Sequence, residues 1–215
     1  MPPKRKKIPN PHLPEIIETL QAEYPDAHCE LNYRSAFQLL IATILSAQCT
    51  DVRVNIVTRD LFKKYRKPQD YLDVPIEVLE EDIRSTGFYR NKAKNIRKAC
   101  EAIIEKHKGK VPRTMAELRE LGGVGRKTAN VVLGNMWNTP DGVVVDTHVS
   151  RISQKLGLTK GGSAEKIEKD LNAIVPEEHW TMLPHWLIFH GRRVCKARKP
   201  DCDHCALYPY CYQRS

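Results

Sequence analysis

The chain has no long hydrophobic run and no apolar leader. Its most apolar stretch, residues 37–45, is about half as long as the roughly 18–20 residues that a membrane-spanning helix requires. Residues 1–7 are hydrophilic and basic, and no apolar segment of the kind found in secretory signals follows them. We therefore expect no membrane partner and a cytoplasmic location.

A sheet signal is also missing. No segment alternates apolar and polar residues convincingly, and the one β-like fragment, residues 143–145, is too short to build a sheet. There is no internal repeat, and the basic arm at residues 4–7 is the only biased tract. The composition, 41% hydrophobic and 28% charged over 215 residues, is ordinary for a globular protein with one good core or two modest ones.

Helical signals run through almost everything between residues 13 and 191, so we expect an all-α fold. Ser35 to Gln38 and Thr114 to Glu117 match the capping box, which predicts helix starts near 35 and 114. Pro75 suits a first helical position. Further helices are expected at about 13–23, 51–65, 75–86, 90–107, 126–136, 147–157, 163–173 and 181–191.

Four of the seven cysteines lie close together near the C-terminus. Cys195, Cys202, Cys205 and Cys211 follow the spacing C-x6-C-x2-C-x5-C. Soft thiolate ligands suit either a tetrahedral zinc or an iron-sulfur cluster, and spacing alone leaves both open. Only one close pair is present, which favours a cluster over zinc, and disulfides are the third alternative.

The other three cysteines, Cys29, Cys49 and Cys100, are isolated, and we interpret them as packing residues of a reduced, intracellular protein. His204 lies between two of the clustered cysteines, and we expect it to be a loop residue and not a fifth ligand.

Positive charge is in excess, with 35 Lys and Arg against 26 Asp and Glu, a net charge of +9 and a pI near 9.2. Such a balance is typical of proteins that approach phosphates, although it does not identify a nucleic-acid partner by itself. Residues 4–7 are interpreted as a solvated arm.

Residues 121–130 form a glycine-rich turn that leads directly into a helix. Glycines such as Gly123 and Gly125 allow close backbone approach, and free amides at a helix start attract a phosphate. The pattern therefore predicts two helices joined by a tight hairpin, with an anion site suited to a DNA phosphate at the start of the second helix. A plain packing corner between two helices would give the same glycines.

These residues carry a family resemblance. LGGVGRKTANVVL at 121–133, VDTHV at 145–149, LSAQCTD at 45–51 and the cysteine spacing together resemble the endonuclease III family of helix-hairpin-helix DNA glycosylases, over about residues 13–212. The resemblance implies a 4Fe-4S cluster on the four clustered cysteines. It also implies base excision repair of oxidised pyrimidines, with strand nicking at the abasic site.

The same resemblance assigns roles to single residues. It makes Lys127 the nucleophile and Asp146 its catalytic partner, where the plainer interpretations are a solvated surface lysine and a helix N-cap. A lysine ammonium must first lose a proton, which a helix start and desolvation against DNA both favour. The C1′ atom of the sugar would then be held as a Schiff base, and β-elimination would follow.

The resemblance also implies DNA contacts. Gln48 would fill the gap left by a flipped nucleotide, unless it is only an exposed loop residue. Phe88 would be an apolar wedge, unless it is a core residue. Beside the cysteines, Lys196, Arg198 and Lys199 would face the DNA backbone. The family commonly has Pro where this chain has Gly122, which makes the hairpin more flexible.

We expect two helical lobes. Residues 29–139 would form a helical domain with the hairpin, inserted between an N-terminal arm and helix at 1–28 and a C-terminal part at 140–215 that carries the cluster loop. Lys127 and Asp146 come from different lobes, so the lobes must dock. The expected partner of the monomer is double-stranded DNA with damaged pyrimidines or abasic sites, in the nucleoid.

Two other functions remain open from the sequence. A monofunctional mismatch glycosylase of the same superfamily would activate water and would not need Lys127. A DNA-binding redox sensor would use its cluster as a switch and would leave Lys127 and Asp146 idle.

Overall fold

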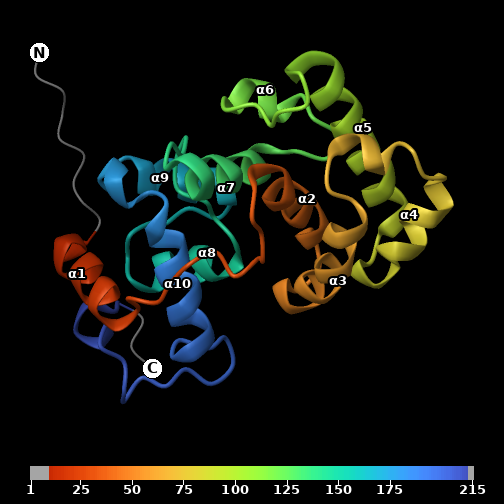
Figure 1. The fold of residues 1–215 in the computed structure, drawn as a ribbon. Helices are drawn as coiled ribbons and strands as arrows, with labels where there is room; N and C mark the ends of the chain where they lie inside the picture. Colours follow the sequence, from red (N-terminus) through yellow and green to blue (C-terminus); the bar gives the residue numbers. More distant parts are fainter. Residues whose placement is uncertain (1–9, 213–215) are drawn as a thin grey trace, which may run out of the picture. The chain divides into compact units, whose positions relative to one another are not determined.

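The computed structural model describes residues 10–212, and the regular secondary structure of this part of the chain is entirely helical, with no strand (Figure 1). The predicted all-α class is therefore confirmed, and residues 143–145 form no strand. Every helix in residues 10–212 is too short or too polar to cross a lipid bilayer. The α-helices are α1 (Leu13–Glu23), α2 (Ala36–Ser46), α3 (Asp51–Lys64), α4 (Ile76–Asp82), α5 (Tyr89–His107), α6 (Met115–Arg119), α7 (Arg126–Trp137), α8 (Thr147–Lys155), α9 (Ala164–Asn172) and α10 (Met182–Arg193).

The two predicted capping residues begin helices as expected. Ser35 Oγ accepts a hydrogen bond of 3.2 Å from the Gln38 amide, and Thr114 Oγ1 accepts one of 3.3 Å from the Glu117 amide. The return half of each box differs from the ideal pattern. Gln38 accepts instead from the Arg34 amide, and Glu117 accepts from the Thr114 hydroxyl itself. Both helix starts are fixed by local side-chain chemistry.

The predicted helix at 75–86 is wrong in part. α4 ends at Asp82, and the 3-10 helix η2 (Arg84–Thr86) follows after Ile83 leaves the helical conformation at φ −106° and ψ 5°. Pro75 is the N-cap and not the first helical residue. Burial of Ile83 and Thr86 explains the break, because the tighter turn brings both side chains into the core.

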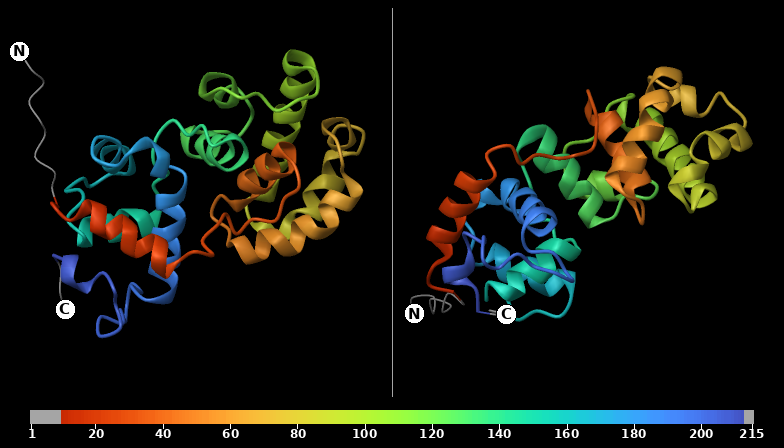
Figure 2. Two further views of the ribbon diagram at one scale, coloured as in Figure 1. Left: turned by 60° about the vertical axis from the view of Figure 1, so that its left-hand side comes forward. Right: turned by 90° about the horizontal axis from the view of Figure 1, so that it is seen from below.

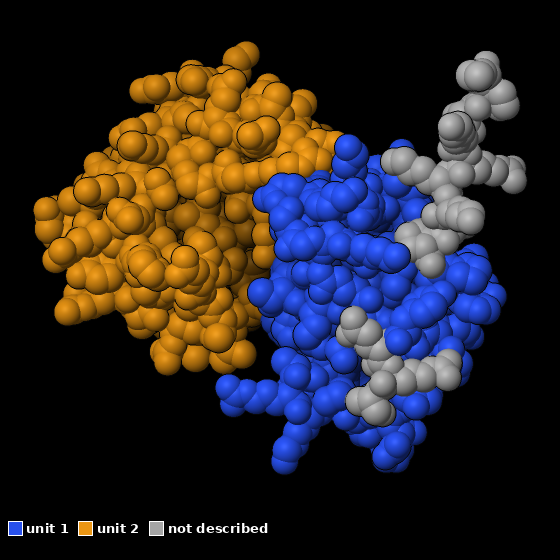
Figure 3. Space-filling view, turned by 180° about the vertical axis from the view of Figure 1, so that it is seen from behind, with its two compact units in different colours: residues 1–29, 142–215 blue, residues 30–141 orange. Residues whose placement is uncertain are grey.

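The chain divides into two compact units (Figure 3). One unit comprises residues 1–29 and 142–215, and the structure describes residues 10–29 and 142–212 of it. The other unit comprises Glu30–Asp141. We call them the terminal unit and the inserted unit. The terminal unit holds α1, α8, α9, α10 and the cysteine loop, and the inserted unit holds α2 to α7.

The inserted unit is organised around α2. All residues from 39 to 45 are buried, which explains why this stretch is the most apolar of the sequence. The helix packs against α3, α5 and α7, so it is covered on several sides. A helix that is apolar on all faces is stable in water only when surrounded in this way. It therefore fixes the positions of the turn at residue 48 and of α7.

The terminal unit has its own core, where α10 packs against both α1 and α8, as the views of Figure 2 show. The core residues of these helices and of α9 are Leu13, Ile16, Ile17, Leu20, Val149, Ile152, Ile167, Leu171, Leu183, Trp186, Leu187 and Phe189. Chain segments from both ends of the sequence thus share one core, which holds the cysteine loop next to α8.

Candidate DNA-contacting residues, catalytic residues and cysteine cavity

The glycine-rich hairpin joins α6 to α7 and packs closely on α5. Gly123 has a φ of +74°, and a Cβ placed on it would lie 2.8 Å from the Asn95 Cβ. A Cβ on Gly122 would lie 2.5 Å from the Asn95 carbonyl oxygen. Gly125 is different, because it is the N-cap of α7 and has open space around its Cα. Gly122 and Gly123 are therefore needed for close packing, while a Cβ on Gly125 would meet no neighbouring atom.

Lys127 lies in the first turn of α7 and is exposed. The preceding residue, Arg126, is an ion-pair partner of Asp141, with Nη1 3.0 Å from Oδ2. On the buried side of the helix, the Asn130 side chain accepts a 2.7 Å hydrogen bond from the Asp141 amide. These contacts hold the first turns of α7 against the segment that follows the helix, so the backbone of Lys127 is fixed in position.

Asp146 is the N-cap of α8. Its backbone is extended, and Oδ1 accepts a 2.8 Å hydrogen bond from the Val149 amide. One carboxylate oxygen therefore has a structural role, as the plainer interpretation of the sequence expected. The residue is half-buried, so the carboxylate is held in one orientation by its cap.

The sequence analysis did not single out His185, whose imidazole is close enough to Asp146 to interact electrostatically with it. Burial lowers the pKa of His185 to about 4, His28 acts in the same direction, and Asp146 opposes both. The imidazole is therefore neutral near pH 7. No sequence signal could have identified it, because α10 meets the start of α8 only in the folded unit.

Gln48 and Phe88 both occupy exposed turns of the inserted unit. Their φ angles are 53° and 49°, in the left-handed region that non-glycine residues seldom adopt. Phe88 is 63% exposed, so the structure rules out a core position for it. An exposed Phe in a strained backbone conformation requires an explanation beyond packing.

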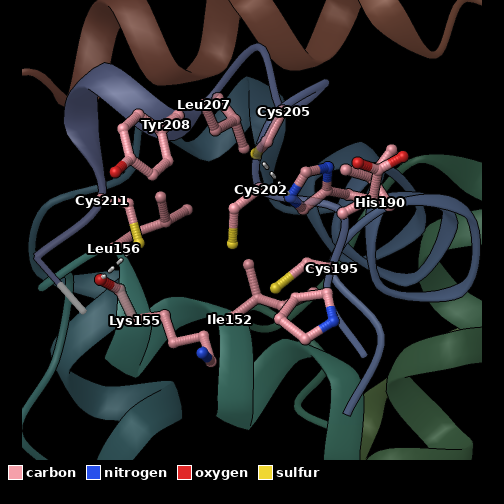
Figure 4. Close-up of a pocket in the computed structure, with 13 residues that line it drawn as sticks. Ile152, Lys155, Leu156, His190, Cys195, Cys202, Cys205, Leu207, Tyr208 and Cys211 are labelled. Atoms are coloured by element: carbon pink, nitrogen blue, oxygen red, sulfur yellow. Dashed lines mark hydrogen bonds between the residues drawn. The ribbon is translucent and has the colours of Figure 1, made fainter. Parts of the chain in front are cut away.

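The four clustered cysteines line one cavity, and their sulfur atoms surround a common space (Figure 4). Cys195 follows Val194, the C-cap of α10, and Cys211 is fixed near α8 by a hydrogen bond of 2.9 Å from the neighbouring Tyr212 amide to the Lys155 carbonyl. The other lining residues are mainly apolar: Ile152, Leu156, Val194, Pro200 and Leu207 are among them. Cys195, Cys202, Cys205 and Cys211 are therefore brought together, as the spacing predicted.

The donor set of this cavity suits an iron-sulfur cluster. Four soft sulfur atoms meet there. Burial raises the pKa of Cys205, a hydrogen bond with the Leu207 backbone lowers it, and the other three cysteines raise it. Arg151 Nη1 lies 3.4 Å from Cys195 Sγ, and His190 Nε2 lies 3.8 Å from Cys205 Sγ. Among residues 10–212, no group of three or more His, Cys, Asp or Glu side chains is arranged to hold a single metal ion.

The cations of the cysteine loop, Lys196, Arg198 and Lys199, are all exposed. His204 does not line the cavity, and its Nδ1 lies 2.9 Å from Asp201 Oδ1 at the surface. It is therefore a loop residue, as expected. Cys100 is fully buried, and burial raises its pKa to about 12, which agrees with a packing role.

Residues 41–177 match the model of the HhH-GPD superfamily of base excision DNA repair proteins. The chain is 51% identical over 197 residues to endonuclease III of Synechocystis sp., covering 92% of this chain and 90% of the relative. It is 42% identical to endonuclease III of Escherichia coli K12, covering 92% and 93%. A solved structure of a trapped endonuclease III–DNA covalent intermediate matches with a TM-score of 0.88 and 50% identity over 94% of each chain.

Proposed function

Because the chain belongs to the endonuclease III family of base excision DNA repair enzymes, we propose that it removes oxidised pyrimidines from double-stranded DNA through Lys127 and then nicks the strand. Membership of this family identifies the chain as an enzyme of the DNA glycosylase class. The alternative of a redox sensor without catalytic activity is therefore excluded. The observation that carries the finer proposal is the exposed Lys127 at the start of α7, directly after the glycine hairpin. We propose that the chain acts as a monomer.

In the proposed reaction the neutral Lys127 amine attacks C1′ of the damaged nucleotide. The bond from C1′ to the base nitrogen breaks, and the base leaves with the bonding electrons and takes up a proton. Loss of a proton from the nitrogen and opening of the sugar give an imine between Lys127 and C1′. Removal of a C2′ proton then breaks the C3′–O bond, and the 3′ phosphate leaves. A mismatch glycosylase that activates water would not need this lysine.

Asp146 is proposed to stabilise the positive charge that grows on the sugar as the base departs. Support comes from its cap, since the hydrogen bond from the Val149 amide holds the carboxylate group at the start of α8. The neutral His185 beside it is suited to orient the carboxylate through a hydrogen bond.

DNA binding is proposed to use two surfaces of the inserted unit. The backbone amides at the start of α7, where Gly125 carries no side chain to obstruct a ligand, would bind a backbone phosphate. Gln48 and Phe88 would enter the base stack when the damaged nucleotide is flipped out, which their exposure supports. Two solved relatives that are 50% identical to this chain are complexes of endonuclease III with DNA.

We further propose that Cys195, Cys202, Cys205 and Cys211 hold a 4Fe-4S cluster. Glycosidic cleavage and β-elimination need no electron transfer, so the role assigned to the cluster is structural. The group would tie the loop between Cys195 and Cys202 to α8 and would hold Lys196, Arg198 and Lys199 in position to contact the DNA backbone.

Incubation with a duplex that contains an abasic site tests the proposal. We expect the strand to be cut on the 3′ side of the site, without added metal. A duplex that contains an oxidised pyrimidine should lose the base first and then be cut. Release of the base with the strand left intact would support a monofunctional glycosylase and would overturn the proposed lyase step.

A further inference from the structure

Lys92 is a buried cation in the core of the inserted unit, with only 4% of its surface exposed. It lies on the first turn of α5, and its Nζ donates two hydrogen bonds to backbone carbonyls. One of 2.7 Å goes to Leu45 near the end of α2, and one of 2.8 Å goes to Thr86 in η2. An ammonium is seldom buried without a carboxylate partner, because desolvation is costly. Its position therefore requires a reason.

Both carbonyls lie next to the turns that carry the proposed stack-entering residues. Leu45 is three residues before Gln48, and Thr86 is two residues before Phe88. At the end of α2 the Cys49 amide donates to the Ser46 carbonyl, three residues back, and not to the Leu45 carbonyl, as it would in a continuing α-helix. The Leu45 carbonyl accepts its hydrogen bond from Lys92. A cation at a helix C-terminus also interacts favourably with the helix dipole.

The two turns share a backbone feature. Among the described non-glycine residues, four have positive φ: Gln48, Phe88, Lys108 and Asn138. Lys108 and Asn138 are helix C-caps, where the left-handed conformation is common. Gln48 is instead the third residue of a turn that the hydrogen bond from the Cys49 amide to the Ser46 carbonyl closes, and Phe88 is the N-cap of α5. Each follows shortly after a carbonyl that Lys92 binds. Such strain persists only where the surroundings fix it.

We propose that Lys92 is a positioning residue, which joins the two turns through one ammonium and so holds Gln48 and Phe88 at a fixed spacing for entry into the DNA stack. This inference rests on the proposed function. A single nitrogen bonded to both turns makes them move as one body, so the side chains are arranged before DNA binds. Preorganisation of this kind lowers the cost of filling the gap.

The test uses the full-length protein with Lys92→Met, which keeps the length of the side chain and removes the ammonium. The probe is an abasic-site duplex with 2-aminopurine opposite the site, whose fluorescence reports unstacking. We expect the nicking rate to fall on the order of tenfold or more, because misplaced positioning groups have large effects on rate. The fluorescence rise should be lost, while affinity for an undamaged duplex should stay unchanged.

The matched control is Ile103→Ala, a fully buried residue on the same helix, three turns further along. It lowers the stability of the core without touching either turn. At a temperature where both variants are folded, the control should keep the fluorescence rise and the nicking rate. If Lys92→Met does not fold, Lys92→Gln takes its place, because its amide can still donate to one carbonyl.

A double-mutant comparison separates positioning from a general structural role. In a Gln48→Ala, Phe88→Ala background, Lys92→Met should slow nicking by less than about twofold, because residues that act through one another are not additive. The full tenfold loss in that background would overturn the positioning role. So would an unchanged fluorescence rise in Lys92→Met. Failure of the wild-type protein to nick the duplex would instead overturn the proposed function itself, and the positioning role with it.

Discussion

At the scale of single residues, one side chain can be both structural and catalytic. Asp146 caps α8 through one oxygen and is proposed to stabilise the charged sugar through the other. The two roles can be separated by substitution, because an N-cap needs an oxygen acceptor, whereas charge stabilisation needs the negative charge.

Asp146→Asn should leave the melting temperature almost unchanged, since Asn and Asp are similar N-caps. Base release should fall by roughly 100-fold to 1,000-fold, the usual cost of removing one electrostatic contact in a transition state. Single-turnover excision and thermal unfolding measure the two effects. Asp146→Ala is the matched variant, and its free energy of unfolding should also fall by about 1 kcal/mol. Wild-type excision by Asp146→Asn would show that the cap is its only role.

At the scale of elements, the hairpin between α6 and α7 contains glycines with different tasks. Gly123 is held at positive φ against Asn95, while Gly125 has open space around it. Gly123→Ala should therefore lower the melting temperature, and Gly125→Ala should lower DNA affinity with only a small stability loss from the weaker N-cap. Thermal unfolding and fluorescence anisotropy with a labelled duplex compare the two. Equal DNA affinity of Gly125→Ala and wild type would place the phosphate contact elsewhere.

The helices themselves could largely be predicted from the sequence, because their signals are local. The N-cap residues Ser35 and Thr114 and the helical spacing of apolar residues act within one or two helical turns. α2 and α6 therefore begin where the capping residues predict. The 3-10 segment after α4 could not be predicted, since the burial of Ile83 and Thr86 decides it.

The candidate site could be predicted only in part, for the same reason. The cysteine spacing indicates a shared cavity because its members lie within one loop. The exposure of Phe88, the burial of Lys92 and the proximity of His185 to Asp146 all depend on contacts between distant segments. Lysine is usually a surface residue, so nothing in the sequence distinguishes Lys92 from its neighbours.

At the scale of the whole molecule, the net charge of +9 should make DNA binding strongly dependent on salt. If Lys196, Arg198 and Lys199 bind phosphates, changing all three to Ala should reduce the slope of log affinity against log salt by about 0.9 for each phosphate that is no longer neutralised. The matched control changes Arg59, Lys63 and Lys67, three exposed cations of the inserted unit, and removes the same charge. Identical slopes in the two triple variants would mean that the cysteine loop does not touch DNA.

Metal content tests the proposed cluster in the intact protein. We expect four irons and four sulfides per chain, in line with four thiolates around one cavity. The purified protein should also be brown. Removal of the iron by a chelator should loosen the loop between Cys195 and Cys202 and weaken DNA binding. Zinc without inorganic sulfide would contradict the cluster assignment.

The most direct test of the central claim is borohydride trapping during turnover on a duplex with an oxidised pyrimidine. An imine at C1′ is reduced to a stable amine, so the wild-type protein should become covalently joined to the DNA strand. Lys127→Ala should give no adduct, while Lys127→Ala and wild type should bind the duplex to a similar extent. A Lys127→Ala protein that is trapped at the wild-type yield would show that another amine forms the imine, and Lys127 would not be the nucleophile.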